Sequence, residues 1–329
     1  MGHLTPFLRL ARLLASCNVK VTFITPEPTV SLAESQISPP LSALVTDMSL
    51  TAAVVPITEA LKIPNFIFFT SSAKMLTLFV SFHTLAGSKD YIKIPTLEPI
   101  PRSWIPPSLL QDTNNLLKTY IIENGKSTTK SDGILVNTLE SIEQSSLLAL
   151  NGGKVIEGLP LVTAIGLLPP LYFEDHQPLA WLDDQPAGSV VYVSFGSRTA
   201  ITREQLRELG NGLPAVGGFL SHCGWNSVTE AMWHGVHVLA WPQHGDQKIN
   251  ADLVERIGLG TWEKSWSWGG GEIVMREQIA EKIKEVMGNK LLRSQAMRIR
   301  EEARNGIELG GGSKKGLTEL IKMLKKERS

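Results

Sequence analysis

The chain has 329 residues, and its 32 lysines and arginines are balanced by 32 aspartates and glutamates, so the formal net charge is zero. This balance argues against a strongly basic nucleic-acid-binding protein and against a polybasic protein of the membrane surface. The length predicts about two domains. A composition of 43% hydrophobic and 19% charged residues is that of an ordinary globular protein.

The two cysteines, Cys17 and Cys223, are too few for a disulfide framework and form no CxxC pair for zinc. We therefore expect thiols in a reducing compartment and no metal site. The most apolar window, 52–69, is interrupted by two prolines and two charged residues, which argues against a membrane span. Arginines also interrupt the N-terminal apolar stretch that a signal peptide would need. The protein is thus expected to be cytoplasmic.

In the first half of the chain, apolar patterns with the periods of helices and strands alternate. Helices are predicted over 6–15, 57–61 and 72–85, with a further helix ending at Leu150. Strands are predicted over 19–25 (VKVTFIT), 41–47 (LSALVTD), 65–69 (NFIFF) and 133–138 (GILVNT). Such alternation favours an α/β fold with a parallel sheet.

A second series of strands and helices follows a proline-rich and acidic stretch, 169–178, that we interpret as a linker. Strands are predicted over 189–195, 216–220 and 236–241, helices over 202–213 and 227–234, and mostly helix over 276–326. We therefore expect an N-terminal domain, 1–168, and a C-terminal domain, 179–329, that ends in helices.

The turn after the predicted strand 216–220 has the features of an anion site. His222, Cys223 and Gly224 lie in it, and a helix starts immediately afterwards. The unpaired N–H groups at a helix start suit a phosphate. Ser227 with Glu230 has the spacing of a capping box, which is also the purely structural interpretation of these two residues.

A loop after the next predicted strand carries Asp246 and Gln247, a carboxylate beside an amide, which suits the vicinal hydroxyls of a sugar. In open α/β sheets, ligands bind beyond the carboxyl ends of strands, where both loops are expected. Taken singly, each residue has an ordinary structural explanation, such as a packed histidine or a core tryptophan.

Taken together, the run GGFLSHCGWNS…E…G…PQHGDQ…NA resembles the plant secondary-product glycosyltransferase box, which marks UDP-dependent glycosyltransferases of small molecules. The resemblance extends over the chain and includes MGHLTP at the start, AWLD at 180–183 and SFGS at 194–197. The stretches SLAESQ, LVTDMSL, FTSSAKM and IPRSWIPP are most similar to plant flavonoid C-glucosyltransferases.

This resemblance implies the GT-B type of fold, with two facing Rossmann-like domains that bind the acceptor mainly in the first and the UDP-sugar in the second. It implies a monomer that needs no metal or other cofactor and takes UDP-glucose as co-substrate. Transfer would invert the anomeric carbon, and the acceptor would be a phenolic or flavonoid compound. Both O- and C-glycoside formation remain open.

The family also implies roles for individual residues. His3 would be the general base, and Asp47 would orient its ring and stabilise its charged form. The donor-binding residues would be Ser197, His222, Trp225, Asn226, Ser227, Glu230, Asp246 and Gln247. Among these, Glu230 would accept hydrogen bonds from the ribose, Asp246 and Gln247 would hold the sugar, and the diphosphate would lie at the turn and Ser197.

Three segments of the family pattern are missing from this sequence, so pieces of both domains are expected to be absent. The chain begins at the loop after the family's first strand, Gln36 runs almost directly into the Ile37–Pro40 segment, and Leu213 joins Pro214 directly. The last gap removes the tryptophan that would stack on uracil, a contact worth ~1–3 kcal/mol. One alternative is therefore a non-catalytic or misassembled remnant of the family that binds nucleotide weakly or not at all.

The sequence lacks the motifs of two other classes of nucleotide-binding protein. A dinucleotide oxidoreductase would need a G-x-G-x-x-G run after a strand, whereas Gly217 and Gly218 lead into one. The glycine-rich region near Gly310 has no lysine at the place that a P-loop requires.

Overall fold

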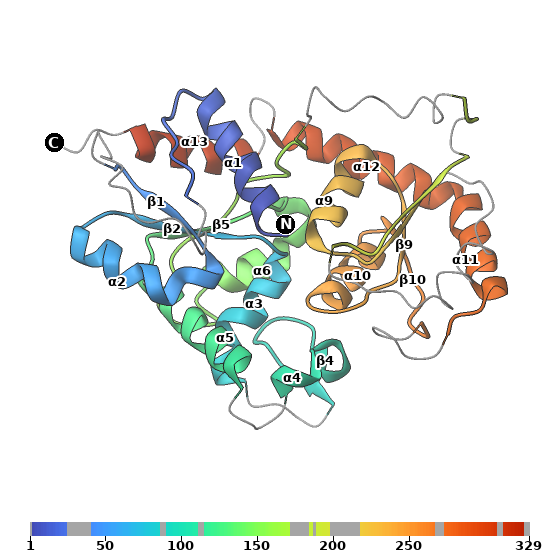
Figure 1. Ribbon diagram of the computed structural model, residues 1–329, viewed down its shortest axis with the longest axis horizontal. Coiled ribbons are helices and arrows are strands. Elements are labelled where there is room, and N and C mark those ends of the chain that lie inside the picture. The colour runs from blue at the N-terminus through green and yellow to red at the C-terminus, as the bar shows by residue number, and fades with distance from the viewer. Residues whose placement is uncertain are drawn as a thin grey trace.

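Two parallel sheets, one in each half of the chain, organise the computed structural model into two lobes that lie side by side (Figure 1). The structure describes residues 2–24, 41–85, 90–110, 115–171, 184–186, 189–197, 218–266, 273–307 and 312–325. The start of the chain lies at the junction of the two lobes in this view, which places the first helix beside both of them.

The first lobe contains four parallel strands in the order β1-β2-β5-β6. They are β1 (Leu44–Asp47), β2 (Asn65–Phe69), β5 (Gly133–Val136) and β6 (Val162–Ala164). All residues of β2 and β5 are buried, as expected for apolar runs covered on both faces. The helices between the strands are α2 (Thr51–Leu61), α3 (Ala73–Ser81), α5 (Leu116–Ser127) and α6 (Glu140–Asn151).

Short elements complete this lobe. They are η1 (Met48–Leu50), η2 (Phe82–Thr84), β3 (Tyr91–Ile92), β4 (Ile100–Pro101), η3 (Arg102–Trp104), α4 (Pro107–Leu110) and η4 (Thr128–Lys130). β3 and β4 form a separate antiparallel pair.

Helices from both ends of the chain pack on the first sheet. The apolar side of α1 (Leu4–Ser16) contributes Leu10 and Leu14 to a cluster with Phe68, which also includes Leu317 and Leu320 of α13 (Gly312–Lys325). Figure 1 shows α13 over the first lobe, where it continues from the end of α12. The chain therefore returns to the first lobe after completing the second.

The second lobe repeats the arrangement with four parallel strands in the order β10-β9-β8-β7. They are β7 (Val191–Ser194), β8 (Gly218–Ser221), β9 (Val238–Ala240) and β10 (Gly260–Trp262). The helices are α9 (Trp225–His234), α10 (Gln247–Arg256), α11 (Arg276–Gly288) and α12 (Lys290–Ile307). Gly260 of β10 is required for the tight pairing, because a Cβ there would lie 2.0 Å from the Val238 carbonyl oxygen.

Most predicted elements are confirmed, including strands at 65–69 and 133–138 and the helical C-terminal region. The strand predicted over 19–25 is wrong for 19–24, which pair with no strand. Val21, Phe23 and Ile24 are exposed, and a β-pattern without a paired neighbour does not form a strand. The helix 202–213 and most of the linker 169–178 lie outside the described residues, so the domain division stays a prediction.

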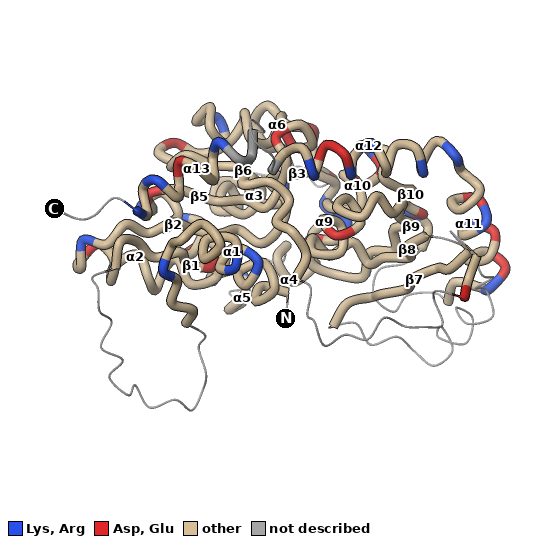
Figure 2. Tube along the Cα trace, turned by 90° about the horizontal axis from the view of Figure 1, so that it is seen from above, with Lys and Arg blue, Asp and Glu red and all other residues tan. Residues whose placement is uncertain are grey.

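Charged residues are mixed in sign over both lobes, and α11 and α12 carry both kinds (Figure 2). This agrees with the zero net charge. In the described ranges, no helix combines the length and apolar character needed to cross a membrane.

Candidate functional site

His3 lies at the start of α1, where its ring meets the carboxyl ends of two strands of the first sheet. Its Nδ1 atom is 2.8 Å from Oδ2 of Asp47, the last residue of β1. It is also 3.2 Å from the hydroxyl oxygen of Thr70, which follows β2. Because a carboxylate only accepts hydrogen bonds, Nδ1 of His3 carries the ring proton and donates a hydrogen bond to Asp47.

Asp47 is held in its charged form. Burial acts to raise the pKa of this carboxyl, but hydrogen bonds from His3 and from Ser49 lower it more, so the pKa lies below its ordinary value. The side chain of Asp47 is 14% exposed, whereas the imidazole above it is 61% exposed. An accessible histidine oriented by a buried carboxylate suits general-base chemistry.

A tight turn joins β8 to α9 in the second lobe. Cys223 adopts a left-handed φ of 62° there, which is uncommon for a residue with a side chain. The Cys223 carbonyl accepts a hydrogen bond of 3.0 Å from Asn250 Nδ2, which fixes the turn. α9 then begins at Trp225 with Gly224 as N-cap and no side-chain cap. This leaves its first N–H groups suited to an anion.

The capping box predicted for Ser227 and Glu230 is therefore wrong. The helix begins two residues before Ser227, so that this serine lies in the first turn and not at the N-cap. Ser227 is half-buried in the first turn of α9. Its sequence spacing to Glu230 was correct for a cap, but Gly224 and not Ser227 ends the turn.

His222 packs closely against the glycines of both neighbouring turns. A Cβ on Gly196 or on Gly224 would lie 2.6 Å from its Nε2 atom, so neither position accommodates a larger residue without movement. Nδ1 donates to the Ser194 carbonyl oxygen at 3.1 Å. Burial lowers the pKa of His222 below its ordinary value, despite this bond. A bound phosphate would favour the protonated ring, because opposite charges attract.

The polar residues around the α9 start differ in their accessibility. Ser197 is exposed in the loop after β7. Asn226 donates from Nδ2 to the Gly2 carbonyl oxygen at 2.8 Å, which links the second lobe to the residue before His3. Its Oδ1 is buried and meets no hydrogen-bond partner in the part of the chain that the structure describes.

Trp225 does not present its side chain to a donor. The indole is 4% exposed within the second-lobe core, and its Nε1–H donates to the Asn137 carbonyl oxygen of the first lobe at 3.0 Å. The ring and the N–H of the indole are thus both used within the protein, and donor binding by Trp225 stays a prediction. Its backbone N–H, at the first position of α9, remains part of the helix start.

The carboxylate of Glu230 forms an ion pair across the lobes. Arg9 of α1 donates from a guanidinium nitrogen to Glu230 Oε1. The arginine side chain is 3% exposed and the glutamate side chain 43% exposed. Glu230 thus faces the junction of the lobes and stays accessible on one side.

Asp246 and Gln247 occupy different environments at the start of α10. Asp246 Oδ2 accepts hydrogen bonds from the hydroxyl of Ser71 in the first lobe and from Asn250 Nδ2. Gln247 is buried, and its Oε1 accepts from the N–H groups of Gln243 and His244 at 2.7 and 2.9 Å. Gln247 therefore shapes the loop with the oxygen of its side chain, while Asp246 lies at the junction of the lobes.

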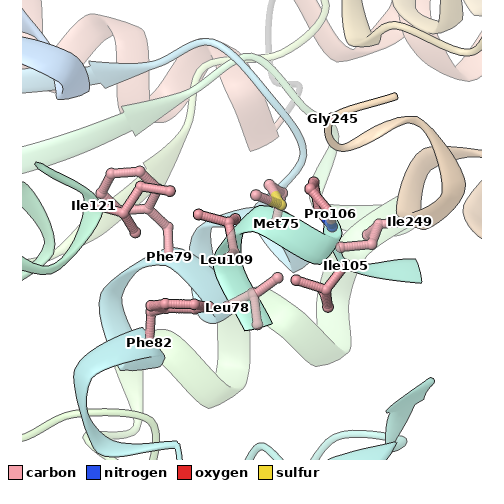
Figure 3. Close-up of a pocket in the computed structure, with 10 residues that line it drawn as sticks. All are labelled: Met75, Leu78, Phe79, Phe82, Ile105, Pro106, Leu109, Ile121, Gly245 and Ile249. Carbon is pink, nitrogen blue, oxygen red and sulfur yellow. The ribbon is translucent and has the colours of Figure 1, made fainter. Parts of the chain in front are cut away.

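A small, partly open apolar pocket lies next to this loop. Figure 3 shows side chains from α3, α4 and α5 pointing toward it, and α10 closing its other side. The lining residues are Met75, Leu78, Phe79, Phe82, Ile105, Pro106, Leu109, Ile121, Gly245 and Ile249. Gly245 directly precedes Asp246, so the pocket and the carboxylate share one loop.

Sequence reasoning missed four residues that organise this region: Arg9, Thr70, Ser71 and Asn250. Thr70 and Ser71 follow β2 directly, where the rule on the carboxyl ends of strands would have indicated them. Asn250 is fully buried and joins the turn at Cys223 to the first lobe. Nothing in the local pattern of α1 indicates that Arg9 reaches Glu230.

Comparison with known proteins assigns the chain to a family. A family model described as UDP-glucoronosyl and UDP-glucosyl transferase matches residues 205–302. UDP-glycosyltransferase 708G2 of Citrus unshiu is 40% identical in an alignment that covers 98% of this chain and 94% of the relative. The chain belongs to the UDP-glycosyltransferase family. These enzymes use a UDP-sugar as co-substrate, as the sequence predicted.

Two solved structures confirm the GT-B fold of this UDP-glycosyltransferase. The crystal structure of LpCGTa in complex with UDP is 39% identical with a TM-score of 0.88, over 99% of this chain and 97% of that one. The crystal structure of Medicago truncatula UGT71G1 complexed with UDP-glucose is 25% identical with a TM-score of 0.73, over 86% of this chain and 75% of that one.

The truncation relative to the family is also confirmed. The alignment with the Citrus unshiu enzyme runs over 443 positions, whereas this UDP-glycosyltransferase has 329 residues, so internal segments of the relative have no counterpart here.

Proposed function

We propose that this UDP-glycosyltransferase transfers glucose from UDP-glucose to a phenolic or flavonoid acceptor with inversion at the anomeric carbon. The observation that carries the proposal is the contact between the two predicted half-sites. The His3–Asp47 pair of the first lobe adjoins the α9 start of the second through the bond from Asn226 to Gly2. A base and an anion site at one junction suit transfer between an acceptor and a nucleotide sugar.

The base acts on the acceptor hydroxyl. With Nδ1 donating to Asp47, His3 would take the proton at Nε2. The acceptor oxygen then forms a bond to the anomeric carbon while the bond from that carbon to the β-phosphate breaks, and UDP leaves. Asp47 stabilises the imidazolium that results, because it stays charged.

The donor's diphosphate is placed at the start of α9, where the helix N-terminus and His222 favour negative charge. Asn226 and Ser227 in the first turn of α9, and Ser197, which follows the glycine packed on His222, have polar groups that would bind the diphosphate. Glu230 would accept hydrogen bonds from the ribose, and Asp246 and Gln247 would hold the sugar. Support for glucose comes from the UDP-glucose bound to the Medicago truncatula relative.

We propose that the acceptor's aromatic ring packs against the apolar side chains that line this pocket. The segment 70–75 supports this choice, because Thr70 contacts His3, Ser71 contacts Asp246 and Met75 lines the pocket. Apolar walls with a few convergent polar groups are typical of small-molecule sites. The apolar side chains of the pocket thus lie in the same segments as the groups that contact His3 and Asp246.

Transfer to carbon requires the same base. His3 would deprotonate a phenol, the ortho ring carbon of the phenolate would attack the anomeric carbon, and UDP would leave. The proton on that ring carbon then moves to the carbonyl oxygen that the attack created, which restores the aromatic phenol. The resemblance of FTSSAKM and IPRSWIPP to flavonoid C-glucosyltransferases supports C-transfer.

The test is turnover of a phenolic acceptor panel with UDP-glucose, followed by mass spectrometry of the products. We expect a product heavier by one hexose, and its fragmentation separates C-linked from O-linked glucose. A folded chain that produces no glucoside and releases no UDP with any of the acceptors would reject the proposal and favour a non-catalytic remnant.

A further inference from the structure

Two of the carboxylates proposed for donor binding are held by residues of the opposite lobe. Asp246 and Glu230 belong to the second lobe, yet Ser71 and Arg9 of the first lobe donate to them. In both cases the hydrogen bond from the first lobe falls on one carboxylate oxygen. The other oxygen has no hydrogen bond within the described ranges of the chain.

At Asp246, the held oxygen is Oδ2, which accepts from both Ser71 and Asn250. Asn250 is fully buried, and Ser72 donates to its Oδ1 at 3.0 Å. These bonds fix the plane of the carboxylate from two sides. Oδ1 is then left to accept from a ligand, since each carboxylate oxygen offers about two acceptor sites.

At Glu230, the held oxygen is Oε1 and the donor is Arg9. The arginine side chain is almost fully buried, and its Nε is buried without a partner in the described residues. A buried guanidinium with so few partners needs the carboxylate for charge compensation. Glu230 is therefore anchored at one oxygen, and its exposed side remains open to the junction of the lobes.

We propose that Ser71 and Arg9 are positioning residues of the donor site, which orient Asp246 toward the sugar and Glu230 toward the ribose. This rests on the proposed function. The donor site of the second lobe is thus completed by the first lobe. Orienting a carboxylate before the ligand arrives removes the loss of rotamer freedom from the binding step, which strengthens binding.

The test for Ser71 is Ser71→Ala, measured by titration calorimetry with UDP-glucose and with UDP. We expect UDP-glucose to bind about fivefold more weakly, with a change of less than about twofold for UDP, since only the sugar contact loses its support. The matched control is Ser141→Ala. Ser141 also donates to a carboxylate across the lobes, at 3.3 Å to Glu302, but outside the donor site. Ser141→Ala should leave the affinities for UDP-glucose and for UDP unchanged.

The test for Arg9 is Arg9→Met, measured with UDP and with 2′-deoxyuridine diphosphate. Wild type should prefer UDP by about tenfold, as expected for a charge-assisted hydrogen bond to the ribose. Arg9→Met should reduce this preference toward one, and Arg9→Lys should restore part of it. Arg256→Met, which removes the interlobe pair with Glu98, is the control and should retain the preference.

Three results would overturn the proposal. Tighter donor binding by Ser71→Ala or Arg9→Met would mean that the first lobe competes with the donor. Equal losses for UDP and UDP-glucose in Ser71→Ala would mean that the contact is only structural. An unchanged preference for UDP in Arg9→Met would exclude its role at the ribose. A wild type that is folded but binds neither nucleotide would instead reject the proposed function itself.

Discussion

Replacement of Trp225 by phenylalanine tests how the two lobes are joined. The indole Nε1–H donates to the Asn137 carbonyl oxygen at 3.0 Å, and the ring is buried against both lobes. Phenylalanine leaves this buried carbonyl without its donor, which costs about 1–3 kcal/mol. The smaller ring also leaves a void worth roughly 1 kcal/mol. We therefore expect Trp225→Phe to lower the free energy of unfolding by about 2–4 kcal/mol.

The control is Trp266→Phe. Trp266 is buried in the second lobe, where its ring packs 4.5 Å from that of Trp241, and no hydrogen bond of its indole is found in the described residues. This variant should lose only the volume term, about 1 kcal/mol. Urea unfolding, followed by circular dichroism, compares the two variants with wild type.

Equal losses in the two variants would refute the reasoning, because the bond between the lobes would then contribute nothing. Binding of UDP gives a second readout. Since the indole of Trp225 is used within the protein, Trp225→Phe should leave the UDP affinity of the folded protein unchanged. A marked loss of affinity would restore the donor-binding role expected from the sequence.

Three further changes have distinct expected outcomes. His3→Gln should lower kcat by about 10²–10⁴-fold with unchanged UDP affinity, and equal kcat in a turnover assay would exclude His3 as the base. Because the pKa of Asp47 is lower in the folded protein than its ordinary value of 3.8, the charged carboxylate stabilises the fold above pH 3.8, and this stability is lost as the pH falls through the folded pKa. The destabilisation by Asp47→Asn, measured by urea unfolding, should therefore shrink below pH 3.8. A destabilisation that does not depend on pH would contradict this. Gly260→Ala should destabilise by about 3 kcal/mol or more in the same assay, because the new Cβ meets the Val238 carbonyl oxygen, whereas Gly288→Ala, which meets no atom within 4 Å, should be neutral.

Local sequence patterns predicted the elements whose residues are all buried or whose ends are marked by a glycine. The run NFIFF forms β2 because every residue of it is buried, and the turn before α9 follows from the order of strand, glycine and helix. Residues 19–24 have an equally good strand pattern, but they pair with no strand among the residues that the structure describes. A strand depends on a partner that its own residues do not specify.

The contacts between lobes were beyond prediction from local patterns. Arg9 and Glu230 are 221 positions apart, and Ser71 and Asp246 are 175 apart. The spacing of Ser227 and Glu230 indicated a cap, but Glu230 is used across the junction of the lobes instead. The pairing of His3 with Asp47 was expected from the family resemblance, because position in one sequence gives no distance.

The measurement that tests the central claim most directly is thermal melting of the whole chain with and without excess UDP-glucose. A ligand that binds only the folded state stabilises it by about 2.7 kcal/mol at a hundredfold excess over Kd. We predict a cooperative melt whose midpoint rises with the concentration of UDP-glucose. A cooperative melt that UDP-glucose leaves unchanged at millimolar concentrations would contradict a donor site between the lobes.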